Sequence, residues 1–289
     1  MKIIITGARG LVGAELSRRF AGGHEVLALG RAELDVTDAG AVRPFIEGER
    51  PGLVVNCTVL GVDECEREPA KARAVNVEAP ASLAAAAHAA GAEFLHFGTN
   101  YVFDGRTPGR APYTFEDEPR PLNVYGRTKL EGEVAATEAC PRTYVVRTSW
   151  VFGPRKATFL GAAPRELRAG RGVRAIEDTW ASATYVADLA ARVAEIVGRG
   201  RHGTYHVVNE GVCSYYEFAL EAARLVGLDA EEAARLVVPV GEDEKRREAE
   251  RPRYTPMKCL LSERVGLKPL RDWRAALAEY VAAGDAGRA

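Results

Sequence analysis

A glycine-rich stretch, Gly7-Ala-Arg-Gly-Leu-Val-Gly13, follows the apolar run Lys2–Thr6 and opens a helical pattern over Leu11–Phe20. Glycines between a buried strand and a helix permit a tight turn and close packing of the helix on the strand. The free N–H groups at such a helix start suit a phosphate. We predict a dinucleotide-binding turn, with a purely structural turn as the alternative. Its candidate cofactor residues are Gly7, Arg9, Gly10, Leu11, Val12 and Gly13.

Apolar runs and amphipathic helical stretches alternate over the first half of the chain, which is typical of a parallel sheet covered by helices on both faces. The predicted strands are Lys2–Thr6, 24–29, 53–55, 93–97 and Thr143–Thr148. We therefore predict an α/β fold, a doubly wound parallel sheet (Rossmann), with a cofactor-binding domain over residues 1–150. The looser pattern beyond it, with helices at 187–197 and 216–226 and a strand at 203–208, predicts a smaller C-terminal substrate-binding lobe over 151–289, with some exchange of chain between the two.

Tyr125 and Lys129 lie four residues apart in a predicted helix and would share one face of it. A nearby ammonium favours the ionised form of a phenol, whose ordinary pKa of about 10 is too high for efficient proton transfer near neutral pH. The pair is therefore a candidate for acid–base chemistry. Taken alone, the same spacing also arises in helices where the tyrosine packs in the core and the lysine is solvated.

Composition narrows the range of partners. A formal net charge of −1 gives no broad electrostatic footprint for nucleic acid. No segment has the long uncharged apolar run of a membrane span, and the first residues lack a leader pattern, so we expect a cytoplasmic protein without membrane contact. The five cysteines form no cluster with histidine at metal-ligand spacing, and we predict no metal site.

The end of the second predicted strand, Leu29-Gly30-Arg31, carries no carboxylate where NAD-binding proteins usually hold the ribose hydroxyls. Arg31 suits a 2′-phosphate, and Arg9 could form a second contact. We therefore predict NADPH as the cofactor. NADH remains the alternative, because Glu33 or Asp35 could bind the ribose instead.

Four segments in order carry a family resemblance: the glycine turn, Thr99-Asn-Tyr-Val-Phe-Asp-Gly105, Tyr125-Gly-Arg-Thr-Lys129 and Arg147-Thr-Ser-Trp-Val-Phe-Gly153. With them the chain resembles the extended short-chain dehydrogenase/reductases, and within these the dTDP-4-dehydrorhamnose reductases. The resemblance implies NADPH-dependent reduction of a nucleotide-linked 4-keto-6-deoxy sugar, with dTDP-4-dehydro-L-rhamnose, reduced to dTDP-L-rhamnose, as the first choice. It is also compatible with a homodimer.

The resemblance implies roles for individual residues. Tyr125 would donate a proton to the keto oxygen, Lys129 would lower the pKa of Tyr125 and hold the nicotinamide ribose, and Thr99 would hydrogen-bond the same oxygen. Further cofactor contacts are expected from Arg31, Asp35, Val36, Cys57 and Thr58. Substrate contacts are expected from Thr99, Asn100, Tyr101, Val102 and Trp150.

Departures from the family pattern lie on the substrate side. Asn100 stands where an aspartate is common, and the stretch from Asn56 to Asp63 is one residue short. Two other readings therefore stay open: a non-catalytic NADP-binding regulatory subunit like the beta subunit of methionine adenosyltransferase, and a nucleotide-sugar epimerase. The charged run 241–251 is expected to be a solvated loop or helix, with a mobile lid over the ligand as the alternative.

Overall fold

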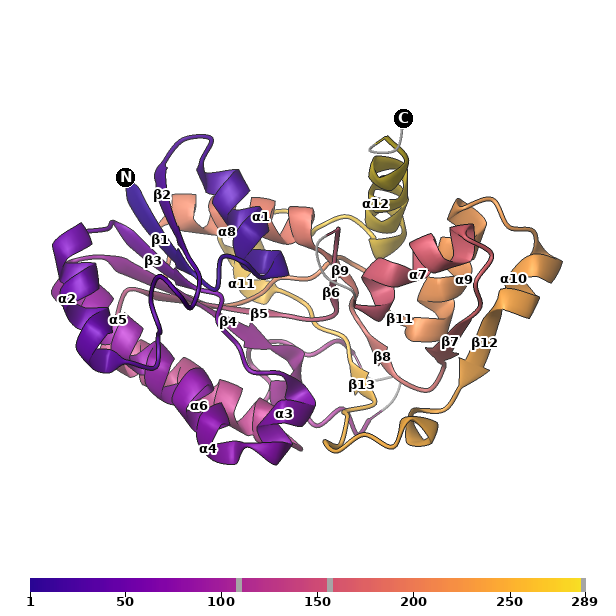
Figure 1. Cartoon of the computed structure of the whole chain (residues 1–289), viewed down its shortest axis with the longest axis horizontal. Coiled ribbons are helices and arrows are strands. Elements are labelled where there is room, and N and C mark those ends of the chain that lie inside the picture. The colour runs from indigo at the N-terminus through magenta and orange to yellow at the C-terminus, as the bar shows by residue number, and fades with distance from the viewer. Residues whose placement is uncertain (108–110, 155–157, 287–289) are drawn as a thin grey trace.

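The computed structural model describes residues 1–107, 111–154 and 158–286. Its centre is a parallel sheet of six strands in the order β2-β1-β3-β4-β5-β10 (Figure 1). The strands are β1 (Lys2–Thr6), β2 (Glu25–Leu29), β3 (Leu53–Asn56), β4 (Glu93–Thr99), β5 (Thr143–Thr148) and β10 (Gly203–His206). The predicted doubly wound α/β fold is confirmed.

The first strand shows why the sheet is covered on both faces. Successive side chains of a strand point to opposite sides. Ile3 and Ile5 belong to the hydrophobic cluster on one face and Ile4 to the cluster on the other, and all three have no exposed surface. An uninterrupted apolar run therefore fits a strand buried on both sides.

Two groups of helices cover these faces (Figure 1). One face packs against α1 (Leu11–Phe20) and α8 (Val186–Arg199), which contact each other. The other packs against α2 (Ala39–Glu49), α5 (Ala79–Ala89) and α6 (Val124–Ala139). Before α5 the chain forms α3 (Val62–Arg67), α4 (Pro69–Arg73) and a π-helical turn (Ala74–Glu78).

The strand order reverses beside β1. The chain runs from β1 to β2 on one side and then crosses to β3 on the other, which leaves a crevice at the carboxyl ends of β1 and β3. Ligands of doubly wound sheets bind at such a switch point. The glycine-rich turn follows β1 directly and therefore lies at this crevice.

A smaller body lies at the right of Figure 1 and has its own hydrophobic cluster, which includes the fully buried Phe218 and Trp273. It contains α7 (Phe159–Arg168), α9 (Tyr215–Leu225), α10 (Ala230–Leu236), α12 (Trp273–Ala286) and the two-stranded sheet of β7 (Val173–Ile176) and β12 (Val237–Val240). Between the bodies lie short strands, namely β6 (Val151–Phe152), β8 (Trp180–Ala181), β9 (Thr184–Tyr185), β11 (Cys213–Ser214) and β13 (Tyr254–Thr255).

Two later segments return to the large sheet. The strand expected at 203–208 is β10; it pairs with β5 instead of joining the smaller body, and α11 (Leu260–Arg264) contacts it. This pairing satisfies backbone groups along an edge of β5 that would otherwise be open. Among the described residues, no helix combines the length and apolar character that crossing a membrane requires.

Candidate active site

The glycine turn fits a nucleotide because side chains are excluded from it. Gly7 has a φ of +66°, and a Cβ there would lie 2.8 Å from the carbonyl oxygen of Cys57. A Cβ on Gly13 would lie 2.5 Å from the carbonyl oxygen of Gly7. The turn therefore packs tightly against the segment after β3, and it brings Cys57 and Thr58 beside the N-terminus of α1. This cradle, together with the free N–H groups at the helix start, suits a pyrophosphate.

At the end of β2 each candidate arginine is paired with a carboxylate. Glu33 accepts a hydrogen bond from the backbone N–H of Gly30 at 2.8 Å and also pairs with Arg9. Arg31 pairs with Asp35 at 3.1 Å through its Nε. The Gly30 N–H holds the pKa of Glu33 below its ordinary value. Both arginines are available for a 2′-phosphate, and both carboxylates are available for ribose hydroxyls.

Gly30, Arg31 and Asp35 border a cavity of about 450 Å³ at the carboxyl ends of β1, β2 and β3. Its lining includes the predicted cofactor residues Gly7, Arg31, Asp35, Val36 and Thr58. An apolar patch from Leu34 and Leu60 completes a surface on which an adenine ring would pack.

The helix α6 presents Tyr125 one turn before Lys129. Asn123 caps the helix by accepting a hydrogen bond from the N–H of Gly126 at 2.7 Å. A Cβ on Gly126 would lie 2.2 Å from the carbonyl oxygen of Tyr101, so this glycine lets the helix approach the short 3-10 helix Asn100–Val102. The rings of Tyr101 and Tyr125 then meet edge to face, with centroids 5.6 Å apart.

Burial controls the titration of both groups. It raises the pKa of Tyr125 above its ordinary value, while a hydrogen bond with Thr99 acts in the opposite direction. Burial also lowers the pKa of Lys129 to about 8, and the Glu133 carboxylate opposes this shift. Lys129 was expected to lower the pKa of Tyr125. The net shift is upward instead, because burial removes the phenolate from water and disfavours it. A raised pKa favours the protonated phenol, which is the form that can donate a proton.

Thr99 and Asn100 form a hydrogen-bonded pair at the end of β4. The Thr99 Oγ1 accepts from the backbone N–H of Tyr101 at 3.2 Å and donates to the Asn100 Oδ1 at 3.3 Å. The Asn100 amide donates to the Thr255 Oγ1 on β13 at 2.7 Å. Asn100 thus joins two segments that are distant in the sequence. Val102 lies in the hydrophobic core and has no exposed surface. The expected substrate contacts of Asn100 and Val102 stay a prediction.

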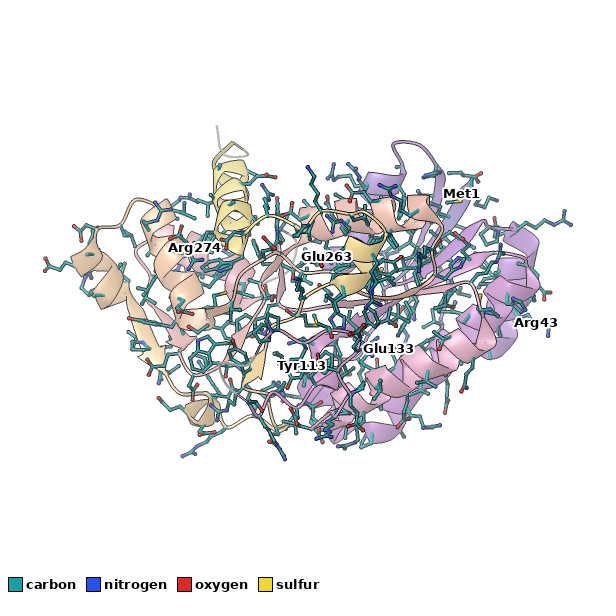
Figure 2. All side chains as sticks on the ribbon, turned by 180° about the vertical axis from the view of Figure 1, so that it is seen from behind. Met1, Arg43, Tyr113, Glu133, Glu263 and Arg274 are labelled. Carbon is teal, nitrogen blue, oxygen red and sulfur yellow. The ribbon has the colours of Figure 1, made fainter. Side chains whose placement is uncertain are left out.

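An ion pair lies one turn beyond Lys129. Glu133 on α6 and Arg147 on β5 are buried and joined by a 2.7 Å contact. The pair crosses β4 at Gly98. A Cβ on this glycine would lie 2.1 Å from a Glu133 oxygen, so the absence of a side chain leaves room for the pair. Figure 2 shows Glu133 nearer the middle of the molecule than Arg43, which lies toward its right end.

Trp150 follows β5 and stacks on Tyr215 of α9, with ring centroids 3.8 Å apart. Its backbone has a φ of +43°, a strained value for a non-glycine residue that is often found at functional sites. The two rings line a cavity of about 350 Å³ together with Phe159, Arg174, Lys245 and Arg247. Aromatic faces beside cationic side chains suit a nucleoside that carries phosphates.

A second cleft of about 650 Å³ adjoins this cavity, and Arg247 lines both. Charged side chains of both signs line it: the arginines Arg106, Arg246, Arg247, Arg251 and Arg253, and the carboxylates Asp104, Glu242, Asp243 and Glu250. The charged run at 241–251 supplies three of these arginines, and most of its residues are exposed, as expected. Glu242 and Arg251 are buried exceptions, and Arg251 pairs with Asp63 at 2.8 Å. These two charges can be buried because each has a partner of opposite charge, Arg247 for Glu242 and Asp63 for Arg251.

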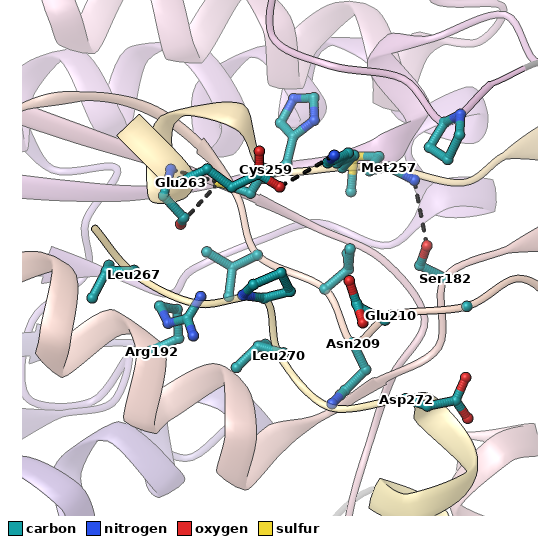
Figure 3. A pocket seen from close by; sticks show the side chains of 18 of the residues that line it. Ser182, Arg192, Asn209, Glu210, Met257, Cys259, Glu263, Leu267, Leu270 and Asp272 are labelled. Atoms are coloured by element: carbon teal, nitrogen blue, oxygen red, sulfur yellow. Dashed lines mark hydrogen bonds and ion pairs between the residues drawn. The ribbon is translucent and has the colours of Figure 1, made fainter. Parts of the chain in front are cut away.

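A further cavity of about 370 Å³ lies elsewhere, between the segment after β10 and the chain leading into α12 (Figure 3). Glu210, Asn209, Glu263 and Asp272 are among its lining residues. None of the predicted cofactor or catalytic residues is among them, so the candidate active site lies elsewhere, at the glycine turn and the first turns of α6.

Sequence reasoning missed several residues of this site. Tyr215 and Arg247 come from segments without a local motif, and His96 contacts the Lys129 Nζ from β4 at 3.1 Å. Only the alternation of charge in the 241–251 run could have pointed to Arg247. Their convergence depends on tertiary packing.

Comparisons with known proteins agree with this geometry. The RmlD substrate binding domain family matches residues 1–285. A dTDP-4-dehydrorhamnose reductase of Mycolicibacterium smegmatis is 42% identical over 98% of this chain and 85% of its own length. A dTDP-4-keto-6-deoxy-D-glucose reductase of Streptomyces niveus is 33% identical over 96% of this chain and 95% of its own. The crystal structure of a Bacillus anthracis dTDP-4-dehydrorhamnose reductase in complex with NADP has a TM-score of 0.91, 28% identity, and coverage of 98% and 99% of the two chains.

Proposed function

We infer, from the premise that this chain belongs to the dTDP-4-dehydrorhamnose reductase family, that it is an NADPH-dependent reductase of a nucleotide-linked 4-keto-6-deoxy sugar. The reaction reduces the keto group of dTDP-4-dehydro-L-rhamnose to give dTDP-L-rhamnose. The observation that carries this conclusion is the half-buried Tyr125 one turn before the buried Lys129 on α6, together with a glycine turn at the switch point of the sheet.

The residues present fit the cofactor. Gly7 and Gly13 allow the close packing of the turn, whose helix start suits a pyrophosphate, and Arg9 and Arg31 stand at the end of β2, where a 2′-phosphate would bind. When bound, the nicotinamide supplies the hydride. Tyr125 holds the proton for the keto oxygen, and the Thr99 hydroxyl lies beside it to stabilise developing negative charge.

The substrate route that we propose runs from Tyr125 past Tyr101 to the cleft that Arg247 lines. Arg247 borders both this cleft and the cavity of Trp150 and Tyr215. We place the diphosphate against Arg247 and the base against the stacked rings. Cationic side chains and aromatic faces support this assignment, since the substrate combines two phosphates with an aromatic base.

The test is oxidation of NADPH, followed by its near-ultraviolet absorbance, against dTDP-, UDP- and GDP-linked 4-keto sugars. We expect turnover with the dTDP sugar and a KM that rises at least tenfold in Arg247→Ala. Arg43→Ala, an exposed arginine on α2 paired with Glu47, is the matched control and should leave both constants unchanged. Tight NADPH binding without turnover on any sugar would contradict the function.

The same assay separates the two other readings. An epimerase would convert the sugar without net consumption of NADPH, and a regulatory subunit would bind NADPH and alter a partner enzyme. We also keep the homodimer and the cytoplasmic location as proposals, which sedimentation and cell fractionation would test.

A further inference from the structure

A chain of buried hydrogen bonds links Lys129, His96 and Asn56. The side chain of His96 has no exposed surface, and Lys129 is 2% exposed. The His96 Nε2 lies 3.1 Å from the Lys129 Nζ, and the Nδ1 lies 3.2 Å from the amide nitrogen of Asn56. Both ring nitrogens are therefore engaged, and the position of the ring proton follows from the orientation of Asn56.

The orientation of Asn56 is fixed by a backbone donor. The N–H of Thr58, which can only donate, points to the Asn56 Oδ1 at 3.0 Å, and the Thr6 hydroxyl donates to the same oxygen at 2.9 Å. The Asn56 NH₂ group must then face the His96 Nδ1. Because an NH₂ group only donates, Nδ1 must accept, and the proton of a neutral imidazole must reside on Nε2.

Only one protonation state of Lys129 can accept a hydrogen bond from an Nε2–H that points at its Nζ. An ammonium has three donors and no lone pair, so it would oppose the imidazole N–H, whereas a neutral amine accepts it. We propose that His96 is a positioning residue for Lys129: Asn56 holds its ring in the Nε2–H tautomer, and this N–H is the hydrogen-bond partner of the neutral Lys129 amine.

This arrangement rests on the proposed function and completes its proton balance. Tyr125 gives its hydroxyl proton to the substrate oxygen and becomes a phenolate. Lys129 replaces that proton through an intervening hydroxyl or water, and the amine that remains accepts the hydrogen bond from His96. A solvent proton then restores the ammonium, so one proton is consumed for each hydride delivered.

Other groups also act on Lys129 and must be kept constant in a test. Glu133 faces it from α6, Cys57 from the segment after β3, and Cys65 from α3. Glu133 favours the ammonium, while burial favours the amine. His96 adds a directional preference that none of these groups supplies.

The ring nitrogens can be observed directly by NMR on protein labelled with ¹⁵N in its five histidines. His96→Gln identifies the signals of His96, and His206→Gln, another buried histidine, is the matched control. We expect a neutral ring with a protonated Nε2 and an unprotonated Nδ1 between pH 6 and about 9, and a shift of the Nε2 signal as Lys129 titrates. A protonated Nδ1 or an imidazolium in this range would overturn the proposal. The experiment uses no substrate, so its failure is distinct from failure of the proposed function.

Asn56→Asp gives a second test. A carboxylate accepts where the amide donated, so the ring should change to the Nδ1–H tautomer and Nε2 should accept from the ammonium. The alkaline midpoint of the kcat profile should then rise by about one pH unit. An unchanged tautomer in a folded Asn56→Asp variant would refute the role of Asn56. If this variant does not fold, the wild-type spectrum still decides the tautomer.

Discussion

The carboxylate of Glu33 accepts the backbone N–H of Gly30 at 2.8 Å and pairs with Arg9 at the end of β2. A carboxylate in this place suits ribose hydroxyls and repels a 2′-phosphate. Glu33→Gln should therefore lower the KM for NADPH severalfold and leave the KM for NADH equal or higher. Initial rates with each cofactor at saturating sugar measure this. A parallel change for both cofactors would count against it.

Arg31 is the complementary position. It pairs with Asp35 but is 81% exposed, so it can turn to a 2′-phosphate at little cost. Arg31→Ala should raise the KM for NADPH about tenfold and change the KM for NADH much less. Equal effects on both cofactors would remove the argument for 2′-phosphate recognition.

Tyr125→Phe retains the ring that packs against Tyr101 and loses the proton donor. We expect cofactor affinity to persist and kcat to fall by about two orders of magnitude or more, the usual effect of losing a general acid. Single-turnover kinetics with bound NADPH would measure the chemical step itself. Near-normal turnover would reassign the donor.

The pH dependence follows from Lys129, whose pKa is lowered to about 8 by burial. The ammonium is lost as the pH rises through this value, so kcat for reduction should fall above about pH 8, tenfold per unit at the limit. Lys129→Arg, which stays charged but cannot release a proton, should have a lower kcat at every pH and show no decline in this range. An alkaline decline shared by both proteins would point to another group.

Gly98 tests the buried ion pair through stability. Gly98→Ala would place a Cβ 2.1 Å from a Glu133 oxygen and 2.8 Å from the Arg147 Cγ, which should separate the pair and cost about 3 kcal/mol of unfolding free energy. Gly48→Ala, in the helix α2 with nothing within 4 Å of the new Cβ, is the control. It should be neutral or stabilising by about 0.5–1 kcal/mol. Urea unfolding measures both variants.

The parts of the site that could be predicted from sequence are those set by local rules. The glycine turn and the Tyr125–Lys129 pair depend on spacing along one element, and the structure forms both elements where they were expected. The joining of Asn100 to Thr255 across 155 positions could not be predicted, because only tertiary packing brings them together. The burial of Arg251 could not be predicted for the same reason: its partner Asp63 lies far away in the chain.

The pairing of β10 with β5 in the large sheet affects how the chain folds during synthesis and where it can be truncated. A nascent chain that ends before Gly203 has a sheet that stops at β5, a fully buried strand whose outer backbone groups then have no β10 partner. Such an edge is a template for association with other chains. The cofactor-binding half is therefore not expected to fold as a separate unit. A fusion or truncation that cuts the chain near residue 150 should yield aggregating protein. One that retains residues through His206 keeps all strands of the sheet.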